Sequence, residues 1–246
     1  MEANKMLRYI EEVLENMPAD WLNLTTHRLD IYDEKLAKTQ FLEEFENLYK
    51  AANSEASALN ALPTAYDYIR LGHPLSSILE WAIANQNNLK AENVISFSSK
   101  TVPVLAILRK NLLVNKNTQI FYMGELPSYF DADLIRKVYG YNFELKKIES
   151  EAAISEFDGS IIFISNQEEI SKIETNANID FYINLYSDLG SILIVNGEEN
   201  QSFISEIQHV RRRETIAMTP ANSYIALQIL LRKPSNKVEK SETANN

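Results

Sequence analysis

The sequence lacks cysteine altogether. This absence excludes disulfide bonds, thiolate metal sites and cysteine nucleophiles. Glycine is also scarce, because the 246 residues include only six glycines and none of them cluster. Nucleotide-binding loops need clustered glycines to let the backbone approach a phosphate group, so the Rossmann fingerprint and the P-loop are both absent.

Lysine is missing from a long stretch in the second half of the chain. No lysine occurs between Ile173 and Arg232, whereas lysines are spread through the remainder. The three histidines, His27, His73 and His209, are also far apart and show none of the spacings typical of metal ligands. We therefore expect no metal site, and no chemistry that needs a lysine from this stretch.

Acidic residues outnumber basic ones, and the formal net charge is -10 at pH 7. Affinity for phosphate backbones comes mainly from lysine and arginine, so this charge disfavours a nucleic-acid partner. The three consecutive arginines at residues 211–213 depart from the trend; we expect them on an exposed helix face, with a phosphate-facing role as the alternative. No apolar run reaches the length of a membrane span, and residues 1–17 lack the apolar centre of a signal peptide, so we expect a cytoplasmic location without a membrane partner.

Hydrophobic periodicity divides the chain into three parts. Residues 1–61 carry apolar side chains at helical spacing, which predicts an N-terminal helical region. Residues 62–232 alternate helical and β-rich segments, which is typical of a mostly parallel sheet covered by helices on both faces. Residues 233–246 contain no large apolar side chain except Val238, so we expect a disordered tail. The predicted fold class is therefore α/β with three layers.

The elements of the α/β part can be assigned from their apolar patterns. The β-rich runs predict strands at residues 92–99, 118–123, 142–148, 160–165, 180–186 and 191–197. The helical patterns predict helices at residues 77–89, 102–113, 128–140, 151–157, 203–218 and 221–233.

The turn after the first predicted strand carries a group of polar residues. Ser98, Ser99, Lys100 and Thr101 lie between this strand and a helix that has Pro103 in its first turn. Hydroxyls and unpaired N–H groups at a helix N-terminus form an anion site, to which a lysine adds positive charge. The alternative is that Ser99 or Thr101 only caps the helix. The turn is therefore a candidate phosphate-binding site.

Four short motifs near this turn resemble a known enzyme family. They are Tyr68-Ile69-Arg70-Leu71-Gly72-His73-Pro74, Leu79-Glu80, Ile83-Ala84 and Phe97-Ser98-Ser99. Together they resemble the cystathionine γ-synthase and cystathionine β-lyase family, the pyridoxal-phosphate (PLP) enzymes of cysteine and methionine metabolism. The resemblance implies the large-domain fold of fold-type I PLP-dependent transferases, in a shortened relative without the family's smaller C-terminal domain.

The resemblance also implies a cofactor site. Tyr68 and Arg70 match family residues that reach from a neighbouring subunit to the cofactor phosphate, and residues 98–101 match the turn that cradles it. The family's glycine in this turn is Lys100 here, which crowds the turn but can reach a phosphate. The resemblance therefore implies PLP or another phosphate as ligand, held non-covalently, and a homo-oligomer or an assembly with a related subunit.

The residues that attach the cofactor covalently in the family have no match in this sequence. Family members hold PLP through a lysine amine and protonate its ring nitrogen with an aspartate. The segment that resembles the lysine region, residues 186–190, contains no lysine. Asp180 is a candidate remnant of the aspartate, with a strand-edge or turn role as the alternative, and Lys100 and Lys172 are the nearby candidates to replace the lysine.

These observations predict a catalytically degenerate relative, a pseudoenzyme that binds a ligand or a partner protein. Two alternatives stay open. One is an active PLP-dependent enzyme of cysteine and methionine metabolism whose catalytic residues are displaced. The other is an unrelated doubly wound α/β interaction module, in which the motif similarity is chance.

Overall fold

The computed structural model describes residues 2–23, 34–63, 70 and 72–232 of the chain. Tyr68, His27 and the predicted disordered tail at residues 233–246 lie outside the described residues. None of the described helices is both long enough and apolar enough to cross a membrane.

A six-stranded sheet forms the centre of the α/β part. Its strands are β1 (Val94–Phe97), β2 (Thr118–Met123), β3 (Glu144–Lys147), β4 (Ser160–Asn166), β5 (Phe181–Tyr186) and β6 (Gly190–Val195), in the spatial order β1-β6-β5-β4-β2-β3. The pairs β2–β3, β2–β4 and β4–β5 are parallel. Only β6 runs against its neighbours β5 and β1, so β1 points the same way as β5. The predicted mostly parallel α/β fold is confirmed.

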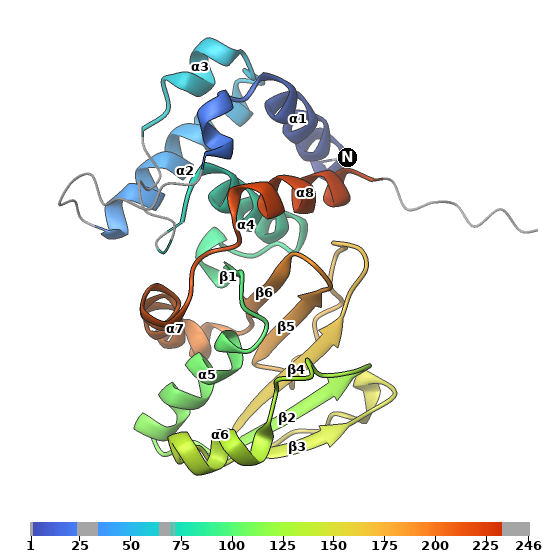
Figure 1. Cartoon of the computed structure of the whole chain (residues 1–246). Helices are drawn as coiled ribbons and strands as arrows, with labels where there is room; N and C mark the ends of the chain where they lie inside the picture. The colour runs from blue at the N-terminus through green and yellow to red at the C-terminus, as the bar shows by residue number, and fades with distance from the viewer. Residues whose placement is uncertain (1, 24–33, 64–69, 71, 233–246) are drawn as a thin grey trace, which may run out of the picture.

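Helices cover both faces of the sheet (Figure 1). On one face lie α5 (Val102–Leu113), α6 (Ala132–Tyr139) and α7 (Gln201–Glu214), packed in one core cluster with the strand residues Phe97, Ile162 and Leu193. The other face packs against α4 (Pro74–Gln86) and α8 (Pro220–Leu231). Strand side chains alternate between the two faces, and both faces of β1, β4, β5 and β6 are buried, which is why these strands read as nearly continuous apolar runs. The edge strand β3 is mostly exposed and polar.

The N-terminal helices α1 (Glu2–Asn16), α2 (Glu34–Lys50) and α3 (Ala56–Asn60) pack on the α4 and α8 side (Figure 1). Their contact is rich in aromatic rings. The ring centroid of Trp81 in α4 lies 5.2 Å from that of Phe45 and 5.3 Å from that of Tyr49, and both pairs are edge to face. Such pairs add stability beyond the burial of their area. The helices thus share one core with α4 and α8, and the division of the chain at residues 61 and 62 stays a prediction.

Three local differences from the predicted elements have physical reasons. Helix α4 begins at Pro74 rather than at residue 77, because His73 and Ser76 form a capping box. The helix predicted at residues 151–157 is only a short 3-10 turn, Glu151–Ala153. Strands β5 and β6 form an antiparallel hairpin, because the three residues 187–189 that join them are too few for a crossover.

Candidate functional site

The candidate site lies at the edge of the sheet where the parallel strands end. Residues 98–101 follow the end of β1, and residues 187–189 follow the end of β5. The strands β1 and β5 flank β6 and point the same way, so these two segments meet at one edge. Ligands of open α/β sheets bind outside the carboxyl ends of the strands.

The serine turn at residues 98–101 is held tightly to its surroundings. The Ser99 hydroxyl accepts hydrogen bonds from the N–H groups of Thr101 and Val102, both at 3.2 Å. The Ser98 N–H donates to the Ile216 carbonyl at 3.2 Å, and the Ser191 hydroxyl donates to the Ser99 carbonyl at 2.6 Å. Ser99 therefore satisfies the two N–H groups at the start of α5, whereas the N-cap residue Thr101 makes no side-chain capping bond.

Part of the turn is nevertheless left without protein partners. The Thr101 hydroxyl oxygen is buried and makes no hydrogen bond to the described residues. The N–H groups of Ser99 and Lys100 also have no acceptor in the described part of the chain. A buried hydroxyl without a partner is costly, and N–H groups at a helix N-terminus attract anions. The turn thus keeps the donors that a phosphate group would need.

Lys100 fits the turn without strain. Positive φ angles at non-glycine residues occur, within the described ranges, only at Ala52, Asn88 and Asn115, so Lys100 needs no glycine-like conformation. Its Nζ donates a hydrogen bond to the Ser187 carbonyl in the β5–β6 hairpin. The lysine therefore bridges the two segments of the edge instead of blocking the turn.

Tyr68 and Arg70 are the other two residues predicted to contact a cofactor. Arg70 is exposed and makes no hydrogen bond or ion pair with the described residues, and Tyr68 lies outside them. Because the family resemblance places both residues at the site of a neighbouring subunit, their role stays a prediction.

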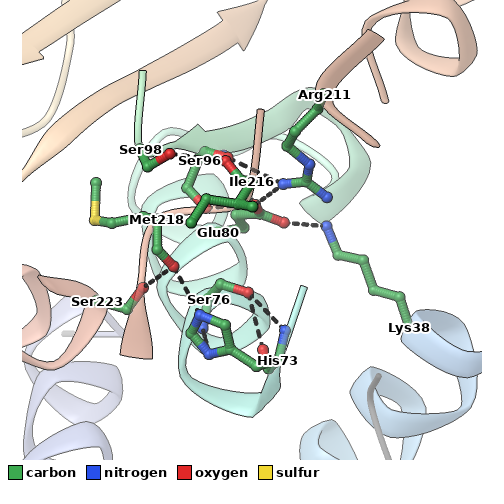
Figure 2. A network of polar contacts seen from close by, with 10 residues as sticks. All are labelled: Lys38, His73, Ser76, Glu80, Ser96, Ser98, Arg211, Ile216, Met218 and Ser223. Carbon is green, nitrogen blue, oxygen red and sulfur yellow. Dashed lines mark hydrogen bonds and ion pairs between the residues drawn. The ribbon is translucent and has the colours of Figure 1, made fainter. Parts of the chain in front are cut away.

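A buried ionic cluster supports the turn from below (Figure 2). Glu80 of α4 accepts hydrogen bonds from the N–H and the hydroxyl of Ser96, both at 2.8 Å, and pairs with Arg211 at 3.0 Å and with Lys38. Burial alone would raise the pKa of Glu80, but the charges of Lys38 and Arg211 outweigh it and lower the pKa to about 2. The end of β1 is thereby tied to α2, α4 and α7.

Arg211 corrects one expectation about the arginines at residues 211–213. Its side chain is 5% exposed and donates to the Ser96 carbonyl as well as to Glu80, so it is not on an exposed helix face and does not face a phosphate. Arg213, by contrast, is exposed. The periodic pattern of α7 places residue 211 one turn after the buried Ile207, a signal that could have predicted its burial.

His73 is a second buried ionisable group close to this cluster (Figure 2). Its Nδ1 accepts from the Ser76 N–H at 3.2 Å, and its Nε2 donates to the Met218 carbonyl at 2.7 Å. Only the neutral imidazole can fill both roles. Burial lowers the pKa of His73 to about 4, against the opposing effects of the Met218 hydrogen bond and the Glu80 charge.

We expect the variant His73→Asn to lose most of the pH dependence of stability between pH 6.5 and 4. The unfolded histidine takes up its proton near 6.5 and the folded one only near 4, so acidification through this window favours the unfolded chain. In the native protein, His73 lowers the free energy of unfolding by about 3 kcal/mol once the pH is below 4. Urea unfolding at a series of pH values measures it. Asparagine still caps the helix, His209→Asn is the control, and an unchanged pH slope in His73→Asn would contradict the assignment.

Asp180 lies away from the candidate site. It directly precedes β5 and so stands at the amino ends of the parallel strands, opposite to the serine turn. Its carboxylate accepts from the Ile161 N–H at 2.7 Å and from Asn200 at 2.8 Å. The structural alternative for Asp180 is therefore the correct one.

A cavity of about 440 Å³ lies at the carboxyl ends of β2 and β4 and along one face of β5; we call it the edge cavity. Ser165, Asn184 and Tyr186 line it from the sheet, and Lys172 lines it from the segment after β4. Ser165 and Asn184 were not predicted as site residues. Each is a buried polar residue in a mostly apolar strand, and that pattern was the available signal.

The fold and the site together define an α/β protein with a polar turn and a cavity at the carboxyl edge of its sheet. No family model matches the sequence, and neither does any curated protein. Among solved structures, it is similar to metB from Corynebacterium glutamicum, with 13% identity, a TM-score of 0.46 and coverage of 91% of this chain and 63% of the other.

Two further structures show a comparable likeness. One is CalE6, a methionine gamma lyase from Micromonospora echinospora, with 12% identity and a TM-score of 0.42 over 68% of this chain and 55% of the other. The other is assigned as an O-acetylhomoserine (thiol)-lyase (metY) from Campylobacter jejuni, with 12% identity and a TM-score of 0.43 over 91% and 70% of the two chains. The chain thus spans less than two thirds of the length of metB and CalE6. The likeness is distant.

Proposed function

We propose that this protein is a non-catalytic ligand-binding relative of the PLP-dependent enzymes of cysteine and methionine metabolism. It binds a phosphorylated ligand, PLP or another phosphate, non-covalently at the serine turn. The observation that carries the proposal is the buried Thr101 hydroxyl without a partner, next to the unused N–H groups of Ser99 and Lys100.

The residues present fit the phosphate part of PLP. The phosphate would be held by the two N–H groups, the Thr101 hydroxyl and the Lys100 amine, which lies within reach across the turn. We propose that the protein assembles with a second copy or a related subunit, so that Tyr68 and Arg70 of the neighbour add to the same site.

The residues do not fit covalent attachment of PLP through the hairpin that follows β5. When bound covalently in an enzyme, PLP supplies an electron sink. The β5–β6 connection consists of Ser187, Asp188 and Leu189, and no lysine occurs from Ile173 to Arg232. We therefore assign no catalytic residue.

Titration with PLP and with inorganic phosphate, followed by calorimetry, tests this proposal. We expect reversible binding of PLP that phosphate displaces, that gel filtration removes, and that leaves no adduct after borohydride treatment. Thr101→Val should weaken binding about ten-fold, since a hydrogen bond to a charged group contributes about 1.5 to 3 kcal/mol. Thr175→Val, in an exposed loop, is the control. Equal affinity of Thr101→Val and the native protein would contradict the assignment.

Arg70→Ala tests the contribution of the neighbouring subunit. If the protein assembles, this variant should bind phosphate more weakly without losing stability, because Arg70 is exposed. Light scattering reports the assembly state of both proteins. An assembled protein whose phosphate affinity does not respond to Arg70→Ala would count against the proposed role.

One observation favours the second candidate function, an active PLP-dependent enzyme with displaced residues. Lys172 lines the edge cavity, close to the strand ends where a ligand would lie. If Lys172 took the place of the family lysine, borohydride would trap PLP on it, and mass spectrometry of the digested protein would find the adduct. Loss of that adduct in Lys172→Met would show that Lys172 holds PLP covalently and would overturn the proposal of non-covalent binding.

A further inference from the structure

We propose that the edge cavity is a second ligand site, separate from the serine turn, which binds a small organic cation that also carries a neutral hydrogen-bond acceptor. An amino alcohol or an amino sugar has this chemistry. The proposal does not depend on phosphate binding at the turn, because none of residues 98–101 lines the cavity.

The position of the cavity in the sheet is the first argument. Strands β2 and β4 are neighbours, but the chain leaves β2 toward β3 on one side and leaves β4 toward β5 on the other. The crevice between two such strands is the topological switch point, where open α/β sheets bind ligands. Met123 at the end of β2 and Gln167 just after β4 both line the cavity.

The walls of the cavity carry an excess of negative charge. Glu149 and Glu151 line it from the segment after β3, and Glu169 and Glu174 line it from the segment after β4. Burial raises the pKa of Glu151, and repulsion from the negative charge of Glu174 raises it further. Lys172 is the one basic residue of the lining. A cation would relieve this repulsion, whereas an anion would add to it.

The sheet side of the cavity is a chain of buried polar groups. Gln167 donates to the Ser165 hydroxyl at 2.9 Å, and this hydroxyl donates to the Asn184 side-chain oxygen at 3.1 Å. Burial raises the pKa of the Tyr186 phenol, and a hydrogen bond with the Asn184 side chain opposes the rise. The raised pKa keeps the phenol protonated at neutral pH, so it can donate a hydrogen bond.

Tyr186 therefore points to a ligand with an acceptor. The residue is 4% exposed and lines the cavity. A hydroxyl or ether oxygen of a ligand could accept a hydrogen bond from its phenol. The aromatic residues Phe163 and Tyr182 also line the cavity and could contact the carbon chain of such a ligand.

A metal ion is a poorer match to the same walls. No group of three or more histidine, aspartate or glutamate side chains within the described ranges is arranged to hold one. The carboxylates are instead spread around a space that can contain an organic molecule, since ligand pockets span roughly 300 to 1,000 Å³. An organic cation meets the spread charge, the aromatic rings and the buried phenol together.

Calorimetry and protein NMR with glucosamine and aminopentanol test the proposal against their uncharged counterparts, glucose and pentanediol. The measurements are made near pH 6.5, where the amines are protonated, and at about 0.15 M salt, where attraction between exposed charges is screened. We expect saturable binding of at least one amine at one site, and at least ten-fold weaker binding of its uncharged counterpart.

Variants locate the binding. The double variant Glu151→Gln and Glu174→Gln should weaken binding at least ten-fold, and Tyr186→Phe at least three-fold. Glu198→Gln with Glu199→Gln is the control, because it removes the same charge near the opposite edge of the sheet and should leave affinity unchanged. Thermal unfolding shows that each variant is folded before its affinity is compared.

Three results would overturn the inference. They are the absence of saturable binding of both amines, equal binding of an amine and its uncharged counterpart, and equal weakening in the cavity variant and the control variant. If the double variant Glu151→Gln and Glu174→Gln fails to fold, Tyr186→Phe and the NMR shifts of the native protein with bound amine test the location of the site. Shifts that fall outside the cavity lining would then count against the site.

Discussion

Glu80→Gln should lower the free energy of unfolding by about 3 to 5 kcal/mol, the cost of removing one partner from a buried ion pair. The side chain of Glu80 is 3% exposed and lies between Arg211 and Lys38, whose side chains are 5% and 12% exposed. Glutamine keeps the size of the side chain but leaves two buried cations without their counter-charge. Chemical denaturation at pH 7 measures the loss.

The control for this variant is an ion pair of the same type on the surface. Glu206→Gln breaks the pair with Arg109, whose side chain is 50% exposed, and should cost less than about 1 kcal/mol. The pH dependence gives a second readout. The pKa of Glu80 is lowered to about 2, so its contribution is present above pH 4.5 and is lost as the pH falls toward 2. If Glu80→Gln and Glu206→Gln destabilised the protein equally, the buried cluster would not have the role described here.

Gly190→Ala is expected to cost roughly 3 kcal/mol or more of stability. Gly190 begins β6 with a φ of +122°, where a side chain is strained, and an added Cβ would lie 2.1 Å from the Phe97 carbonyl oxygen. The backbone of the serine turn would have to move away, which adds the cost of overpacking to the cost of the dihedral angle. Thermal and urea unfolding measure the change in stability.

Gly140→Ala provides a matched control. Gly140 also has a positive φ, +68°, but an added Cβ would meet nothing within 4 Å. It ends α6 in the left-handed conformation, so alanine should cost only about 1 kcal/mol there. Similar losses in the two variants would mean that the close approach of Gly190 to Phe97 contributes nothing.

The sequence predicts most elements of the fold because each has its own apolar period. The strand TQIFYM was placed at the residues where β2 is observed, and the helix before residue 113 was also placed correctly. The direction of β6 was not predicted, since parallel and antiparallel buried strands have the same apolar pattern. The short connection between Tyr186 and Gly190 indicates the antiparallel direction, because three residues are too few for a crossover.

The site is less accessible from sequence because its parts come together only in three dimensions. The serine turn is contiguous, and its capping role and its proximity to a helix N-terminus were both predicted. The edge cavity instead combines parts of three strands with two segments that have little regular structure, and its charge comes from glutamates that read as solvated loop residues. Glu80 is similar: a carboxylate in a helix predicts exposure, and only its pairing with Arg211, far along the chain, explains its burial.

The packing of α1 against α8 has a consequence for biosynthesis (Figure 1). The whole sheet is translated between these two helices, so the apolar face of α1, with Ile10 and Val13 fully buried in the finished protein, has no partner from α8 until translation of residues 220–231. A nascent chain that carries this face uncovered is a natural substrate for chaperones that recognise apolar helices. Folding on the ribosome should therefore finish late, with the N-terminal helices among the last elements to reach their final packing.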